Sequence, residues 1–252
     1  MKKILIISFI LFSELVFSQT EFPYGAGEHA AYKLYFGSIF VGHAELEVKE
    51  IKSINGTPSF HVIGKGRTNT FFDIFFKVRD VYQTFIDSST LLPVQFKRDV
   101  NEGGYLINQN YVFNHTENKV ITKDSIFFIP ENTQDMLSAF FYARTFKKEI
   151  VLAKTNVFEI PIFIDEENSR IEIRYLRNEI INTKWGKINC MVFQPIMQEG
   201  RVFENGEEMK IWVSDDSNHL LIKVEAKIWA GRVGAMLEAY EGLKHPFSIV
   251  KE

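Results

Sequence analysis

The sequence predicts an all-β protein in which antiparallel strands form curved sheets, with one or two short helices. Apolar and polar residues alternate with period two in many segments, as in strands that have one buried face. Clear examples are residues 44–50, 169–176 and 207–214. Short turn sequences separate these segments, so the strands are expected to follow one another as hairpins. So many strands must curl into a barrel, a half-barrel or a sandwich to bury their apolar face.

The N-terminus has the pattern of a signal peptide at residues 1–18. Lys2 and Lys3 precede the apolar run 4–12, and the small residue Ser18 ends the segment. The apolar run is shorter than the roughly 20 residues that span a bilayer, which argues against the alternative of an uncleaved membrane anchor. We therefore expect a chain exported to the periplasm or beyond the cell, with residues 19–252 forming a single β-rich domain.

Turn chemistry marks the hairpins in order along the chain. Asn-Gly pairs occur at Asn55 and Asn205, Gly103 and Gly104 are adjacent, and residues 215–218 read DDSN. These residues favour tight connections between neighbouring strands. A helical segment at 131–147 divides the chain into two strand-rich halves.

Phenylalanines are abundant, with 24 in the chain, and four of them cluster in residues 68–80. Phe71, Phe72, Phe75 and Phe76 have spacings that would gather them on one side of a short helix. Such a turn would pack on the sheet, or its rings would line or gate an apolar pocket. Insertion into a membrane surface is a third interpretation, which the lack of a neighbouring basic cluster disfavours.

The segment 132–146 is expected to form an amphipathic helix. Asn132 is a good N-cap residue, and Asp135 three residues later would complete a capping box. Each residue of a helix is rotated by about 100° from the one before, which places the apolar residues on one broad arc and the polar residues opposite. The arc contains Met136, Leu137, Ala139, Phe140, Phe141 and Ala143, and the opposite side contains Asp135, Ser138, Tyr142 and Thr145.

Arg144 lies inside this apolar arc. It would extend to water near the helix end, form a buried ion pair, or bind the anionic head group of a ligand. Asp80 and Asp87 are the candidate carboxylate partners, because each lies beside an apolar strand segment. Arg144 and the clustered phenylalanines make up the predicted ligand-binding set. Its members are Phe71, Phe72, Phe75, Phe76, Phe140, Phe141 and Arg144.

Several function classes find no support. The formal net charge of −3, with interspersed signs, provides no basic stripe for nucleic acid. The six histidines are scattered singly, so neither a metal site nor a cofactor is expected, and no hydrolase or phosphate-loop motif indicates a catalytic residue. Cys190 is the only cysteine and is expected to be a small buried hydrophobe rather than a reactive thiol.

Four segments together resemble a bacterial exported family called domain of unknown function 3108 (DUF3108). They are residues 27–48 (GEHAAYKLYFGSIFVGHAELEV), 75–105 (FFKVRDVYQTFIDSSTLLPVQFKRDVNEGGY), 134–144 (QDMLSAFFYAR) and 212–237 (WVSDDSNHLLIKVEAKIWAGRVGAML). The resemblance covers roughly residues 22–243. It implies two curved antiparallel sheets, related to an open half-barrel seen in some envelope lipoproteins, and it supplies no activity or catalytic residues. The chain lacks the cysteine that accepts a lipid in such lipoproteins.

Two functions fit these observations. One is a non-catalytic envelope protein that holds an apolar or amphiphilic ligand, a lipid or a glycan-lipid, in its concave sheet. The other is an interaction module that binds a protein partner in envelope or polysaccharide assembly. A hydrolase whose active site lacks a sequence motif is a remote third alternative.

Overall fold

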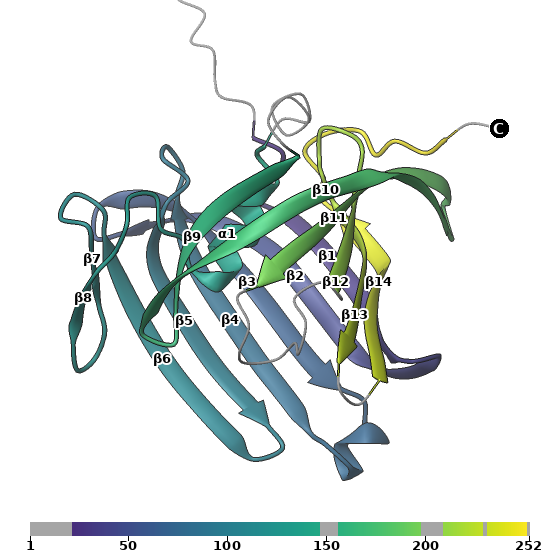
Figure 1. The fold of residues 1–252 in the computed structure, drawn as a ribbon, viewed down its shortest axis with the longest axis horizontal. Helices are drawn as coiled ribbons and strands as arrows, with labels where there is room; N and C mark the ends of the chain where they lie inside the picture. The colour runs from purple at the N-terminus through teal and green to yellow at the C-terminus, as the bar shows by residue number, and fades with distance from the viewer. Residues whose placement is uncertain (1–21, 147–155, 198–208, 229–230, 251–252) are drawn as a thin grey trace, which may run out of the picture.

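The computed structural model describes residues 22–146, 156–197, 209–228 and 231–250. The predicted signal peptide and the Asn205 turn lie outside these residues. The described strands form a sheet of 14 antiparallel strands that curves but does not close into a barrel (Figure 1). The all-β, open and barrel-like fold that the sequence predicts is therefore confirmed.

The elements follow in chain order. The first half contains β1 (Glu28–Phe36), β2 (Ile39–Ile54), β3 (Thr57–Thr68), the 3-10 turn η1 (Phe72–Ile74), β4 (Val78–Asp87), β5 (Pro93–Glu102), β6 (Tyr105–Asn114), β7 (Lys119–Ile121) and β8 (Ile126–Phe128). The helix α1 (Met136–Ala143) follows. The second half contains β9 (Val157–Ile164), β10 (Glu167–Thr183), β11 (Gly186–Met197), β12 (Met209–Ser214), β13 (Leu221–Ile228) and β14 (Gly231–Glu241).

The chain starts at the centre of the sheet and returns to it. Strands β1 to β8 run outward to one edge, the chain crosses through α1 to the opposite edge at β9, and β9 to β14 run back to pair with β1. Tyr32 of β1 is paired with Leu237 of β14. The two sheets implied by the family resemblance are thus one continuous sheet, because β1 bonds to β2 on one side and to β14 on the other.

The sheet curves so strongly that its two edges face each other. Register shifts occur in several strand pairs. In the β4–β5 pair, for example, the register shifts between Phe85 and Ile86 of β4. Such bulges increase the local bend and twist of a sheet. The β9–β10 hairpin crosses the concave face of β4–β6, as Figure 1 shows. There Asp165 forms an ion pair with Arg98 of β5 at 2.5 Å.

Helix α1 lies between the two halves and contacts both β4 and β9. Leu137 and Phe141 pack in the core of the first half. Ala139 packs against Ile160 and Ile162 of β9. A helix enclosed from two sides has little polar surface. For this reason the residues expected on its polar side are covered: Ser138 is fully buried and Tyr142 is half-buried.

The helix begins later than the sequence predicts, and Asn132 is not its N-cap. Asn132 has a left-handed backbone (φ 58°), and Gln134 forms a parallel bridge to Ile162 of β9. This strand-like pairing delays the helix start, and Asp135 takes the N-cap position. The Asp135 carboxylate accepts hydrogen bonds from the backbone N–H groups of Leu137 and Ser138, both at 2.8 Å. The Ser138 hydroxyl accepts in return from the Asp135 N–H at 2.8 Å, which completes a capping box.

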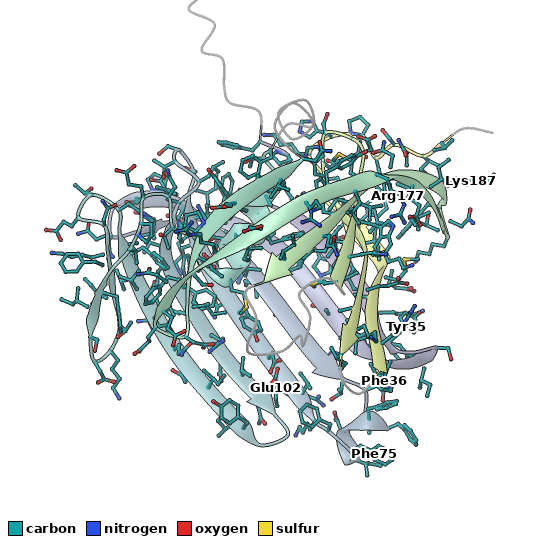
Figure 2. The ribbon with its side chains drawn as sticks, viewed as in Figure 1. Tyr35, Phe36, Phe75, Glu102, Arg177 and Lys187 are labelled. Atoms are coloured by element: carbon teal, nitrogen blue, oxygen red, sulfur yellow. The ribbon has the colours of Figure 1, made fainter. Side chains whose placement is uncertain are left out.

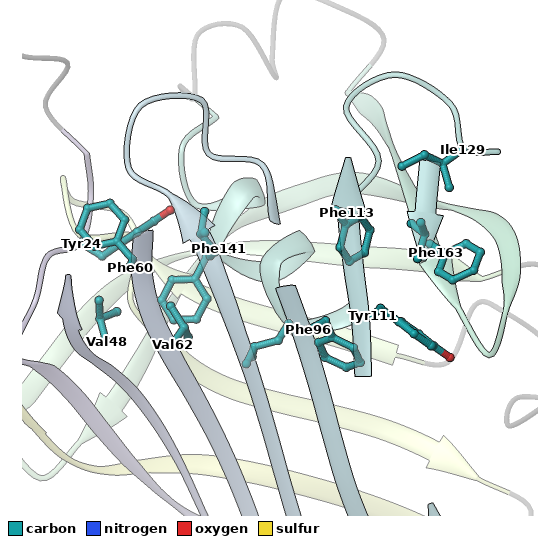
Figure 3. Close-up of a cluster of buried hydrophobic side chains, with 13 residues drawn as sticks. Tyr24, Val48, Phe60, Val62, Phe96, Tyr111, Phe113, Ile129, Phe141 and Phe163 are labelled. Carbon is teal, nitrogen blue, oxygen red and sulfur yellow. The ribbon is translucent and has the colours of Figure 1, made fainter. Parts of the chain in front are cut away.

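The interior divides into one large cluster for each half and a smaller one beside α1. Figure 3 shows the first, in which Tyr24, Phe60 and Phe141 meet edge to face. The second cluster surrounds Trp212 and contains Cys190. Cys190 is fully buried, and burial raises the pKa of its thiol to about 12. The expectation that Cys190 is a small buried side chain is confirmed.

Asp135 makes the stability of the protein depend on pH in an unusual direction. Burial raises the pKa of its carboxyl to about 6, although hydrogen bonds from Thr84, Ser138 and Leu137 oppose the shift. An unfolded aspartate has a pKa of about 3.9, so the folded state binds more protons between these values. The stabilisation from this group is therefore complete below about pH 4 and is lost as the pH rises through 6.

We expect Asp135→Asn to remove this dependence while keeping the cap, because an asparagine oxygen also caps helices well. Between pH 4 and 7 the wild-type free energy of unfolding should fall by about 2 to 3 kcal/mol relative to the variant. Denaturant titrations of both proteins across this range measure the difference. A difference that is constant with pH, or that changes in the opposite direction, contradicts the assignment.

Candidate functional site

An apolar cavity of about 300 Å³ lies between α1 and the strands of the second half. The helix contributes Met136, Ala139, Phe140 and Ala143, which have the i, i+3, i+4, i+7 spacing of one helix face. This face differs from the one that places Leu137 and Phe141 in the core. One side of the helix thus packs in the core of the first half, and another side lines the cavity.

Four neighbouring strands form the opposite wall, and each supplies two or three apolar residues at alternate positions. They are Phe158 and Ile160 of β9, Ile171 and Ile173 of β10, Met191, Phe193 and Pro195 of β11, and Met209, Ile211 and Val213 of β12. Residues two apart point to the same face of a strand. The strand register joins these residues across the wall, with Ile171 opposite Ile160, Ile173 opposite Pro195 and Phe193 opposite Ile211. The result is a continuous apolar wall.

The polar side chains lining this cavity, Arg144 and His219, both belong to a buried network. Arg144 Nη1 and Nη2 donate to the Glu28 carboxylate oxygens at 2.6 and 3.0 Å. Its Nε and Nη2 donate to the Asn218 carbonyl at 3.2 and 2.8 Å. The guanidinium also lies 5.2 Å from the ring centres of Tyr24 and Phe141. Arg144 is 4% exposed, so of the three alternatives that the sequence left open the structure shows the buried ion pair.

The predicted partners of Arg144, Asp80 and Asp87, are wrong. Asp80 accepts a hydrogen bond from the backbone N–H of Asn101, and Asp87 accepts from Ser89 in the turn before β5. Glu28 opens β1 at the centre of the sheet and reaches the helix end instead. The interpretation of Arg144 as an anion site loses support, because four of the five guanidinium N–H groups are directed at Glu28 and Asn218.

The network extends from Arg144 into the second half, and we call it the Arg144 clamp. Its residues are Glu28, Arg144, Asn218, His219 and His245. The Asn218 side chain accepts from the His245 backbone N–H at 2.9 Å and donates to the His245 carbonyl at 3.1 Å. The clamp joins the start of β1, the end of α1, the β12–β13 turn and the segment after β14.

His219 directs one ring nitrogen into the clamp. Its Nδ1 lies 2.6 Å from the Arg144 carbonyl oxygen, which requires that Nδ1 carry the proton and donate. In the neutral ring Nε2 is then an acceptor, and it forms no hydrogen bond with the described residues. A left-handed backbone (φ 45°) holds the residue in this orientation. The apolar cavity therefore has one polar group available at its edge.

A second hollow of about 350 Å³ adjoins the first across Met136, which lines both. It lies on the concave face of β1–β4, and its lining includes Tyr32, Leu46 and Tyr82. Gly64 also lines this hollow beside Leu137, and a Cβ atom there would be in ordinary van der Waals contact with Leu137 Cδ1, at 3.5 Å. Asp80 is at its border, and burial raises the pKa of this carboxyl to about 6.

The structure separates the predicted ligand-binding residues into three places. Phe140 and Arg144 line the cavity, and Phe141 is buried in the core of the first half. Phe71, Phe75 and Phe76 are exposed and Phe72 is half-buried around η1, at the end of the sheet marked by Phe75 in Figure 2. The η1 rings do not line this cavity, so the interpretation that they line a pocket finds no support in it.

The strand residues of the cavity were not predicted as a site. The period-two pattern of residues 169–176 identified a half-buried strand, but it could not distinguish a core face from a cavity face. Among the described residues no cluster of three His, Cys, Asp or Glu side chains could hold a metal ion. In the same residues α1 is too short to cross a bilayer and no longer apolar helix occurs.

The DUF3108 family profile, described as a protein family of unknown function, matches residues 31–238. The chain belongs to the DUF3108 family. The match includes both walls of the cavity and Arg144, whereas Glu28 precedes it. A search of curated proteins finds no match.

A solved structure agrees with the fold of this DUF3108 protein. A β-barrel-like protein of the DUF1849 domain family from Brucella abortus is 9% identical, covers 85% of this chain and 96% of its own, and has a TM-score of 0.55. That likeness supports the fold alone. A putative exported protein with a YmcC-like fold from Bacteroides fragilis is 11% identical over 88% of this chain and 98% of its own, with a lower TM-score of 0.32.

The Arg144 clamp predicts a large and specific loss of stability. Arg144→Met leaves the Glu28 carboxylate buried without its partner, so the free energy of unfolding should fall by about 3 to 5 kcal/mol. The double variant Arg144→Met/Glu28→Leu should lose less than the sum of the two single changes, because it leaves no unpaired charge. Denaturant unfolding measures all three.

Arg177→Met is the matched control, because Arg177 is exposed and forms its ion pair with Glu179 at the surface. It should change stability by about 1 kcal/mol or less. An equally small effect of Arg144→Met would contradict a buried pair.

Proposed function

We propose that this protein is a non-catalytic binding protein for an apolar or amphiphilic ligand, of the lipid or glycan-lipid class. The observation that carries the proposal is the cavity between α1 and β9–β12. Its volume of about 300 Å³ is at the lower end of the range for small-molecule sites, roughly 300–1,000 Å³. Burial of apolar surface would supply the binding energy.

The lining indicates which part of the ligand is apolar and which is polar. The helix face and the four strands offer only apolar side chains, which suits a hydrocarbon chain. His219 Nε2 offers a hydrogen-bond acceptor at the border, which suits a hydroxyl or amide donor on the ligand. Arg144 is engaged with Glu28, so we do not assign the recognition of an anionic head group to it.

The adjoining hollow would extend the site. Met136 separates the two spaces, and methionine is an unbranched side chain that adopts several shapes. Rotation of this one side chain would connect the spaces along the concave face. A ligand longer than the first cavity would then have room without movement of the backbone.

The proposal includes export to the periplasm or the outside of the cell, for which the predicted signal peptide at residues 1–18 is the support. An interaction module with an envelope protein partner remains the alternative function. The observation in its favour is the exposed aromatic surface around η1.

Filling the cavity tests the proposal. Ile171→Trp adds volume from β10 into the cavity and should reduce uptake of an apolar fluorescent probe at least tenfold, with the fold retained by circular dichroism. Ala143→Leu adds volume from the helix side and should act in the same direction. Native mass spectrometry of protein purified from its own envelope should show an extractable extra mass that both variants lack.

Glu172→Trp is the matched control, since residue 172 is exposed and points away from the residue-171 face of the same strand. It should bind the probe as the wild type does. Equal probe uptake by all four proteins would contradict ligand binding in this cavity.

A further inference from the structure

Exposed apolar side chains are concentrated at the end of the sheet formed by the β3–β4 and β5–β6 connections. Phe71, Ile74, Phe75 and Phe76 are each between 54% and 79% exposed. Tyr105 and Leu106, at the start of β6, are 68% and 70% exposed. We call these six residues the aromatic tip. Large apolar side chains exposed together mark a surface that meets another molecule or a membrane.

The two connections form one surface. The Gly103 N–H donates to the Lys77 carbonyl at 2.8 Å. Gly103 is in the left-handed region (φ 59°), and a Cβ atom there would lie 2.6 Å from Phe76 Cε2. Glycine thus lets the Phe76 ring lie directly against the neighbouring turn. Figure 2 shows Phe75 projecting beyond the end of the strands, in the same region as Phe36.

Polar contacts hold the tip in this exposed arrangement. The Asn69 side chain accepts from the Phe72 N–H at 3.0 Å and donates to the Phe40 carbonyl at 3.1 Å. The Asp73 carboxylate accepts from the Thr68 hydroxyl at 2.6 Å and forms an ion pair with Arg79. These bonds fix the backbone of the turn, and its apolar side chains are exposed on that scaffold.

Basic residues lie beside the tip on the β3–β4 hairpin, whereas the exposed carboxylate of Glu102 lies beside it on β5, opposite Val78. Residues 65–79 contain Lys65, Arg67, Lys77 and Arg79 but one carboxylate, Asp73. Strand pairing places Arg67 opposite Arg79. Arg79 is paired with Asp73, whereas Arg67 and Lys77 are exposed and form no ion pair with the described residues. The sequence alone disfavoured a membrane surface for want of a basic cluster, and the folded hairpin provides one.

We propose that the aromatic tip inserts into the surface of a lipid bilayer that carries anionic headgroups. The tip is a projection made of two turns, which suits penetration between headgroups rather than the wrapping of a peptide. Aromatic side chains favour the membrane interface, and flanking Lys and Arg attract anionic lipids. Charge and apolar surface therefore point to the same partner.

The tip would also bring a membrane close to the proposed binding site. Within β3, Gly64 lines the second hollow and Thr68 ends the strand, shortly before the first tip residue, Phe71. Four residues of strand span about 13 Å. Membrane docking does not depend on the proposed ligand-binding function, because it uses none of the residues that line the cavity.

Vesicle flotation tests the docking proposal. The probes are vesicles of phosphatidylcholine with one quarter phosphatidylglycerol, and vesicles of phosphatidylcholine alone. The full chain should float with the anionic vesicles, and Phe71→Ser/Phe75→Ser should lower its partition coefficient at least tenfold, as expected for withdrawing two phenylalanines from the membrane. Arg67→Gln/Lys77→Gln should weaken binding to anionic vesicles and remove part of its salt dependence.

Ile126→Ser/Phe128→Ser is the matched control, because these side chains of β8 are also exposed but lie outside the tip. It should float as the wild type does. The proposal would be overturned if the wild type did not float, or if the tip variant floated equally well. It would also be overturned if the wild type bound no vesicles and the tip variant instead lost a protein partner. The tip variant should still take up the apolar probe, so failure of docking and failure of ligand binding remain distinguishable.

Discussion

The buried ion pair between Arg144 and Glu28 is the constraint on which the arrangement of this protein depends. Two opposite charges withdrawn from water cost free energy unless they are paired with good geometry and further hydrogen bonds. The carboxylate meets the guanidinium with two hydrogen bonds, and the Asn218 carbonyl receives two more of its N–H groups. These requirements are met only when the end of α1, the start of β1 and the β12–β13 turn are together, so the pair selects one relative placement of the two halves.

That placement explains the path of the chain. Strand β1 is central because β14 returns to it, and α1 must then connect two edges that lie far apart in the strand order. The curvature of the sheet brings these edges near one another, and the connecting helix becomes enclosed between them. A helix in this position has two apolar faces to satisfy, one toward the core around Phe141 and one toward the strands β9–β12. The second face is only partly filled, and the cavity results.

Two groups of apolar side chains in this protein lie in opposite environments, one around Phe140 and the other around Phe75. Those around Phe140 line a partly open cavity with almost no polar lining, which suits a ligand with an apolar chain. Those around Phe75 are exposed on a turn that side-chain hydrogen bonds and an ion pair hold in place, with exposed cations beside them. The hydrophobic effect makes both surfaces favourable binding sites, but for different partners: a cavity takes a small molecule, whereas a projecting tip fits a larger apolar phase.

The sequence by itself determined the all-β class, the antiparallel hairpins, the position of the helix and the presence of Arg144 among apolar residues, because each follows from local periodicity and turn chemistry. It could not determine that Asp135 caps the helix, since Asn132 was excluded only by the pairing of Gln134 with β9. It could not identify Glu28, which lies 116 residues from Arg144. The cavity wall and the exposure of the η1 rings were likewise decided by tertiary structure. Alternation assigns a residue to one face of a strand, but only long-range pairing and curvature decide whether that face meets a core, a cavity or water.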